Sequence, residues 1–221
     1  MCTLSRGECH ASLLQEVSLL GFTLDSRLTW SSHIANVCSR LARVTYLLRR
    51  LKPLLTTQYL VTSYHAFFHS HLSYGLQLWG HAPGCSEILL LQKKALRIIV
   101  SAGHTDHCRP IFQQLKILTV YNQYLLTSLT YVRSNEDGLL RRNQHHSHNT
   151  RRGGDIDVPF CRLSKTKNSF PVLAMRLFNH LPADFRKLDE NVFKRRLRGW
   201  LLENPFYSLA EFYGADLATL Y

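Results

Sequence analysis

The fold is decided by residues 64–118, YHAFFHSHLSYGLQLWGHAPGCSEILLLQKKALRIIVSAGHTDHCRPIFQQLKIL. This stretch contains two aromatic–glycine pairs, Tyr74-Gly75 and Trp79-Gly80. A glycine beside a large ring predicts close approach of two backbone segments, or a helix end in the left-handed conformation, with the ring filling the gap. The turn residues Ala82-Pro83-Gly84 then separate two helical patterns. Since no nucleophile–base pair or phosphate-binding loop stands out, the stretch predicts a scaffold.

Apolar residues at spacings of three and four predict helices along most of the chain. Thr29 is expected to cap the first helix, and Gly103 is expected to end the third. The aromatic residues of the second helix are expected in the core, although exposed rings could stack on bases. A short apolar run at residues 17–24 predicts one strand, so the fold class is mainly α with one N-terminal β-strand. The expected helices span residues 30–52, 56–79, 87–101, 120–132 and 191–202, with shorter ones starting near Pro110 and Ser169. The aromatic residues of the second helix are Tyr59, Tyr64, Phe67 and Phe68.

The charge of the chain favours a polyanionic partner. Lys and Arg number 27 against 15 Asp and Glu, which gives a formal net charge of +12 over 221 residues. Such an excess is typical of proteins that bind nucleic acid or an anionic membrane surface. No run of about 18 uninterrupted apolar residues is present, so a membrane-spanning segment is not expected. The 6 cysteines show no C-x-x-C spacing and no signal peptide is evident, so an intracellular, reducing location is expected.

Cations gather on three of the expected helices. The first has no acidic residue between Trp30 and Lys52. Such a helix can lay its charges along a phosphate backbone, where counterion release gives affinity that does not depend on base sequence. The same cations also suit the dipole at a helix C-terminus or a solvated face, and these interpretations stay open. The candidate nucleic-acid-binding residues are Arg40, Arg43, Arg49, Arg50, Lys52, Lys93, Lys94, Arg97, Lys194, Arg195, Arg196 and Arg198.

Three groups of residues could be mistaken for catalytic or metal sites. His104, His107 and Cys108 form an H-x-x-H-C cluster without a clear fourth zinc ligand. A nuclease that uses His104 or His107 as its base is the enzymatic alternative, but no metal or carboxylate set accompanies them. The Asp155-Ile156-Asp157 segment is expected at a strand edge, and Asp25 bounds the expected strand at residues 17–24. The sequence therefore predicts no catalytic residue and no metal site.

Six segments, in this order, carry a resemblance to a known family. They are LGFTLDSRLTWSSHI (residues 20–34), HLSYGLQLWG (71–80), LQKKALRII (91–99), FQQLKILTV (112–120), LFNHLP (177–182) and FKRRLRGWLL (193–202). Together they resemble the region that follows the polymerase core in reverse transcriptases of non-LTR (LINE-like) retrotransposons, those of the jockey type in particular. The resemblance covers roughly residues 17–214.

The resemblance implies a domain organisation. Residues 17–134 would hold the end of the palm strand and a helical, thumb-like bundle that grips the template–primer. Residues 155–214 would form a small helical C-terminal subdomain. Between the two, residues 135–154 are polar, basic and without an apolar period, which predicts a flexible linker. A truncated or replaced N-terminus is expected at residues 1–16, and a tail at 215–221.

The resemblance also implies a function. The family's polymerase site ends in an Asp-Asp pair that holds two metal ions, and this chain contains no Asp-Asp. We therefore expect a non-catalytic fragment without a cofactor, whereas the intact parent polymerase would use Mg. The expected partners are RNA, DNA or an RNA–DNA hybrid, together with the palm and fingers of the polymerase, in the nucleus or the cytoplasm. The alternative is a decayed or domesticated retroelement remnant that acts as a protein-interaction module.

Overall fold

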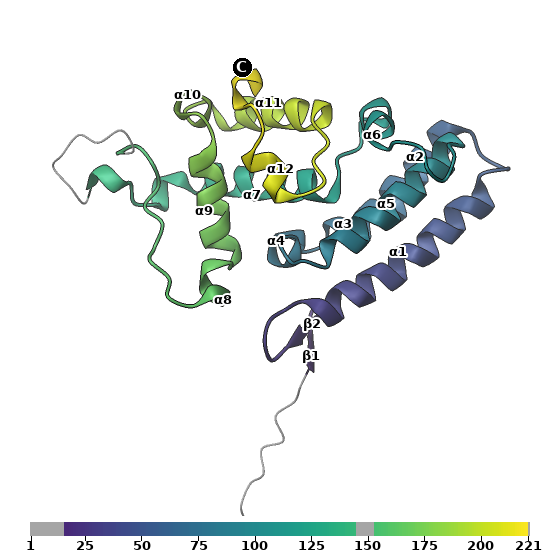
Figure 1. Ribbon diagram of the computed structural model, residues 1–221, viewed down its shortest axis with the longest axis horizontal. Helices are drawn as coiled ribbons and strands as arrows, with labels where there is room; N and C mark the ends of the chain where they lie inside the picture. Colours follow the sequence, from purple (N-terminus) through teal and green to yellow (C-terminus); the bar gives the residue numbers. More distant parts are fainter. Residues whose placement is uncertain (1–15, 145–152, 221) are drawn as a thin grey trace, which may run out of the picture.

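The computed structural model describes residues 16–144 and 153–220 and is mainly helical, which confirms the predicted fold class (Figure 1). The expectations for the N-terminus before Glu16, and for residues 145–152 of the predicted linker at 135–154, lie outside the described residues. The predicted division into a bundle, a linker and a C-terminal subdomain stays a prediction. The buried apolar side chains form one connected cluster that runs from Ile34 to Leu220.

The N-terminal strand region is a β-hairpin. Strand β1 (Glu16–Leu19) pairs antiparallel with β2 (Phe22–Asp25), in the register Val17 opposite Leu24. The chain reverses at Leu20 and Gly21, which have φ of 49° and 81°. Two consecutive positive φ values are typical of the two-residue hairpin turn whose twist matches that of the strands. The continuous apolar run at residues 17–24 therefore folds back on itself.

Asp25 organises the turn that leads into the first helix. Its carboxylate accepts hydrogen bonds from the backbone N–H groups of Arg27, Thr29 and Trp30, and from the Thr29 hydroxyl. Slight burial would raise the pKa of Asp25, but these hydrogen bonds, those of Thr29 first, outweigh it and lower that pKa. The helix α1 (Ser31–Leu51) is preceded by Trp30 at φ 66°, so the cap lies one residue later than Thr29.

Helices α1 and α5 (Cys85–Val100) pack side by side and run in the same direction. At their first turns, Ile34 lies against Gly84, where an added Cβ would come within 3.1 Å of the isoleucine side chain. At their last turns, Lys52 Nζ donates a hydrogen bond to the Ile99 carbonyl at 2.6 Å. The two C-terminal ends therefore lie together.

The segment expected as one helix at residues 56–79 is divided into shorter pieces. It runs as α2 (Thr57–Ser63), a π-helical turn η1 (Tyr64–His69), α3 (Ser70–Ser73) and α4 (Leu76–Trp79). The π-helical turn shifts the register, so Tyr64 and Phe68 are buried whereas Tyr59 and Phe67 are 62% and 47% exposed. The expectation that all four aromatic residues lie in the core was wrong for Tyr59 and Phe67.

Both aromatic–glycine pairs lie at close approaches, but the nearest group is in each case a ring from another part of the chain and not a second backbone segment, and only Gly75 has the predicted left-handed conformation. Gly75 has φ 58° and separates α3 from α4, and a Cβ there would overlap the ring of Phe22, which stacks on Tyr74 at 5.0 Å. A Cβ on Gly80 would lie 2.5 Å from Tyr124 Cδ2. The hairpin therefore packs against the helices at the first pair, and α7 (Val120–Ser134) packs against the end of α4 at the second.

A buried amide joins three parts of the core. Gln92 on α5 is fully buried, and its Nε2 donates to the Tyr64 hydroxyl and to the Leu118 carbonyl, each at 2.8 Å. Its Oε1 accepts from the Val120 N–H at 3.0 Å. Because every polar atom here has a partner, the network specifies the packing of the second helical segment, α5 and the start of α7.

The C-terminal half is held to α7 by a second buried amide. Asn122 Nδ2 donates to the carbonyls of Leu201 and Asn204, and its Oδ1 accepts from the Phe206 N–H. The remaining helices are α6 (Arg109–Leu115), η2 (Glu136–Gly138), η3 (Arg142–Gln144), α8 (Ser164–Lys167), α9 (Phe170–His180), α10 (Ala183–Arg186), α11 (Glu190–Glu203), α12 (Leu209–Tyr213) and η4 (Leu217–Leu220). Within residues 16–144 and 153–220, no helix is long and apolar enough to cross a bilayer.

Candidate nucleic-acid interface

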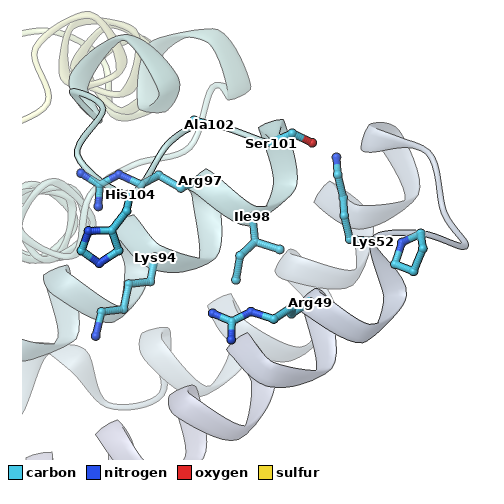
Figure 2. Close-up of a pocket in the computed structure, with 9 residues that line it drawn as sticks. Arg49, Lys52, Lys94, Arg97, Ile98, Ser101, Ala102 and His104 are labelled. Carbon is cyan, nitrogen blue, oxygen red and sulfur yellow. The ribbon is translucent and has the colours of Figure 1, made fainter.

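The C-terminal ends of α1 and α5 border an open, basic cleft of about 760 Å³, called here the α1–α5 cleft (Figure 2). Arg49 and Lys52 reach it from the end of α1, and Lys94 and Arg97 reach it from α5. Ile98 forms its apolar floor, and the remaining lining residues are Pro53, Ser101, Ala102 and His104. The parallel packing of the two helices therefore brings together cations that are more than 40 residues apart in the chain.

Two of these cations are partly used by the fold. Lys52 is half-buried and donates to the Ile99 carbonyl. Arg97 donates through Nε and Nη2 to the Asp106 carbonyl, at 3.1 and 2.7 Å. Cations at the end of a helix also complement its dipole. Part of this charge therefore stabilises the fold, and the same hydrogen bonds hold the Lys52 and Arg97 side chains at the cleft.

The other two cations have no such role. Among the described residues, Arg49 and Lys94 are exposed and have no carboxylate or hydrogen-bond partner. Arg97 binds the backbone carbonyl of Asp106, whereas the Asp106 carboxylate accepts a hydrogen bond from the Gly103 N–H. Arg49 and Lys94 therefore give the cleft an uncompensated positive charge that faces solvent.

The α5 helix ends at Ser101, which has φ 58°, instead of at Gly103 as expected.

The remaining candidates on α1 lie elsewhere. Arg40 and Arg43 border a smaller cavity against the hairpin, together with His33 and Asn36. Arg43 Nε makes only a long hydrogen bond, 3.4 Å, to the Ser39 carbonyl. Arg50 is exposed and lines none of these cavities. The structure therefore separates the first-helix candidates into a group in the middle of α1 and a group at its C-terminal end.

Lys93 points away from Lys94, toward the C-terminal half. Its Nζ lies 3.5 Å from the centre of the Tyr207 ring, and the Arg109 guanidinium lies 4.7 Å from the same ring. Desolvation lowers the pKa of Lys93, with neighbouring Arg97 and Arg109 adding to the effect. Arg109 and Tyr207 were not among the predicted residues, because no local pattern relates residues so far apart in the chain.

The predicted cations of α11 are all exposed, on the face opposite the buried Phe193, Leu197, Trp200 and Leu201. Arg198 faces the π-helical turn, where the rings of His65 and His69 lie 5.5 Å apart. Burial, followed by the neighbouring charges, lowers the pKa of both histidines. Lys194, Arg195, Arg196 and Arg198 therefore form a surface separate from the α1–α5 cleft.

We expect the free energy of unfolding to fall as the pH drops below about 6.5, the ordinary histidine pKa. Burial lowers the pKa of His33, His65, His69 and His81, so the unfolded chain binds more protons than the folded chain. The resulting stability is present above the ordinary pKa and is lost as the pH falls through the lowered values. Replacing His65 and His69 with Gln should flatten this dependence in urea unfolding between roughly pH 7.5 and 5.5.

His33 and His81 remain in the double variant, so part of the pH dependence should persist. A double variant whose stability depends on pH as steeply as the parent would contradict the assignment to His65 and His69.

The sequence clusters that could suggest metal or thiol chemistry are dispersed. No group of three metal-ligating side chains occurs in the described part of the chain. His104 lines the α1–α5 cleft, whereas His107 and Cys108 line a neighbouring cavity. Burial raises the pKa of Cys108, which disfavours the reactive thiolate. Asp155 is paired with Arg186 at 2.9 Å and is not presented as a metal ligand.

Comparison with known proteins finds a region of this chain that is similar to RNA-directed DNA polymerases of mobile elements. The chain is 34% identical over 109 residues to "RNA-directed DNA polymerase from mobile element jockey" and 30% identical over 109 residues to "Probable RNA-directed DNA polymerase from transposon X-element", both of Drosophila melanogaster. Each match covers 47% of this chain and only 12% of the relative. No protein-family model and no solved structure matches the chain. The resemblance to jockey-type elements is confirmed, and the chain contains a region related to non-LTR reverse transcriptases.

Proposed function

We propose that this chain is a non-catalytic, C-terminal part of a non-LTR retrotransposon reverse transcriptase that binds template–primer nucleic acid. The α1–α5 cleft carries the proposal, because two helices present unpaired cations to one open surface. Arg49 and Lys94 would contact phosphates of the two strands or of successive nucleotides. Lys52 and Arg97, which their backbone hydrogen bonds hold in place, would contribute their remaining N–H donors.

The proposal of a non-catalytic role rests on the sequence. The chain has no Asp-Asp pair, and two-metal nucleotidyl transfer needs clustered carboxylates. In the described residues, Asp25 serves a turn and Asp155 an ion pair. Mg would therefore be held by the palm of an intact polymerase, and this chain would supply part of the grip on the duplex.

The test compares binding of a short RNA–DNA hybrid by the parent chain and by the double variant Arg49→Gln/Lys94→Gln. Each lost phosphate contact should reduce the slope of log affinity against log salt by roughly 1, so the double variant should lose about 2. The control Arg27→Gln/Lys187→Gln removes the same charge from exposed positions outside the cleft and should keep the slope. Equal slopes for all three proteins, or no binding at low salt, would exclude this role.

A second candidate function, a protein-interaction module, is favoured by the hairpin. Val17, Leu19 and Leu20 are 47%, 55% and 79% exposed, and the outer edge of β1 has no strand partner among the described residues. Unpaired strand edges with apolar side chains invite pairing with another chain. Light scattering would distinguish the two functions, because Leu19→Lys should abolish self-association or partner capture and should leave hybrid binding unchanged.

A further inference from the structure

A second cavity of about 780 Å³, called here the Phe160 cavity, opens at the other end of the molecule. Figure 1 places α8 and α9 on the left, whereas the C-terminal ends of α1 and α5 lie on the right. Residues of η3, the segment 155–161, α8, α9 and α12 line this cavity. The residues that carry the argument are Arg142, Phe160, Lys167, Arg176 and Tyr213.

The Phe160 cavity is positively charged. Arg142, Lys167 and Arg176 line it, and none of them has a carboxylate partner among the described residues. The acidic residue in the lining, Asp155, is partly buried and already paired with Arg186 at 2.9 Å. The uncompensated charge therefore favours an anionic ligand.

The wall that carries Phe160 is fixed at its base. Asn179 Nδ2 donates to the Ile156 carbonyl at 2.8 Å, and the Ile156 N–H donates to Asn179 Oδ1 at 2.9 Å. The Arg142 N–H donates to the Asp155 carbonyl at 3.0 Å. These hydrogen bonds hold Arg142 and the segment that precedes Phe160 on one side of α9, so the cation and the ring share one wall.

Two aromatic rings border this charge. Phe160 is 90% exposed, and Tyr213 on α12 is 40% exposed. Tyr213 and Arg176 line the same cavity, so this ring too lies at the charged surface. An almost fully exposed phenylalanine next to three unpaired cations offers a flat apolar face for a base and adjacent donors for phosphates.

We propose that the Phe160 cavity binds single-stranded nucleic acid, with one base stacked on Phe160 and neighbouring phosphates at Arg142, Lys167 and Arg176. Duplex bases are stacked on each other and cannot reach the ring, so the site selects unpaired nucleotides. It differs from the α1–α5 cleft in position and in chemistry. That cleft is lined by cations around Ile98 and has no Phe, Tyr or Trp in its lining.

The experiment measures binding of a short oligouridylate by fluorescence anisotropy, with an abasic oligomer of equal length and the RNA–DNA hybrid as further probes. Phe160→Ala should weaken oligouridylate binding roughly tenfold or more without changing its salt slope, because stacking releases no counterions. Phe160→Tyr should retain the affinity, and Arg142→Gln/Arg176→Gln should reduce the slope by about 2. Hybrid binding should be unchanged by Phe160→Ala.

Leu163→Ala is the matched control, because Leu163 is an exposed apolar residue of the same segment, 69% exposed. Unfolding in urea checks that each variant is folded. The proposal is overturned if Phe160→Ala binds oligouridylate like the parent, if Leu163→Ala loses as much, or if the abasic oligomer binds equally well. Loss of hybrid binding in Arg49→Gln/Lys94→Gln tests the α1–α5 cleft alone, so the two proposals can fail separately.

Discussion

Replacing Gln92 with Leu should cost roughly 3–5 kcal/mol of unfolding free energy. Leu has a similar size but cannot bond to the Leu118 carbonyl, the Val120 N–H or the Tyr64 hydroxyl. All three groups are buried, and each buried group left without a partner costs about 1–3 kcal/mol, which the gain in apolar volume offsets only in part. Urea unfolding followed by circular dichroism would measure the shift in midpoint.

The matched control is Gln114→Leu on α6, where the glutamine is exposed and the same chemical change should alter stability by less than about 0.5 kcal/mol. Tyr64→Phe should have an intermediate effect, about 1 kcal/mol, because it removes only one hydrogen bond of the network. Equal midpoints for Gln92→Leu and Gln114→Leu would show that the network contributes nothing.

Replacing Gly75 with Ala should cost roughly 2–4 kcal/mol, from left-handed backbone strain and from overlap together. Gly75 has φ 58°, and a Cβ would occupy the position of the Phe22 ring. The ring cannot move freely, because it stacks on Tyr74 and also contacts Trp30 and His33. The hairpin should therefore separate from the helices or strain the turn between α3 and α4, and thermal unfolding would measure either loss.

Gly138→Ala provides the control, since a Cβ there meets no atom within 4 Å and the backbone has no positive φ. Combining Gly75→Ala with Phe22→Ala separates the two causes. If overlap dominates, the double variant should be more stable than the sum of the single effects predicts; if strain dominates, the effects should add. A Gly75→Ala chain as stable as Gly138→Ala would contradict both causes.

Features that depend on neighbouring residues in the chain were predictable. The apolar face of α11, formed by Phe193, Leu197, Trp200 and Leu201, follows from its spacing and is buried as expected. Pro110 lies at the start of α6, because proline fixes φ at a helical value. The Tyr74-Gly75 pair ends α3, because glycine readily adopts a positive φ. Gly21 indicated a turn, but the apolar residues on both sides of it favoured one continuous strand, and the structure has two strands joined at Gly21.

The candidate site was predictable only as a set of cations. Arg49, Lys52, Lys94 and Arg97 were all among the candidates, but so were Arg40, Arg43, Arg50 and Lys93, which the structure places elsewhere. The sequence could not show that Lys52 and Arg97 are partly occupied by backbone carbonyls. The Lys52 bond exists only because the two helices end at the same place, and the Arg97 bond depends on how the loop after α5 folds back.

The sequence by itself determined that this protein is mainly helical and basic, that it contains no Asp-Asp pair, and that it has a region related to jockey-type reverse transcriptases. These properties depend on composition, on the three-to-four-residue spacing of apolar side chains and on ordered motifs. Only the tertiary structure decided which cations share a surface and that Phe160 stands beside Arg142 and Arg176. Such groupings depend on how distant helices pack, through contacts such as Ile34 on Gly84 and Asn179 on Ile156, which no local pattern specifies.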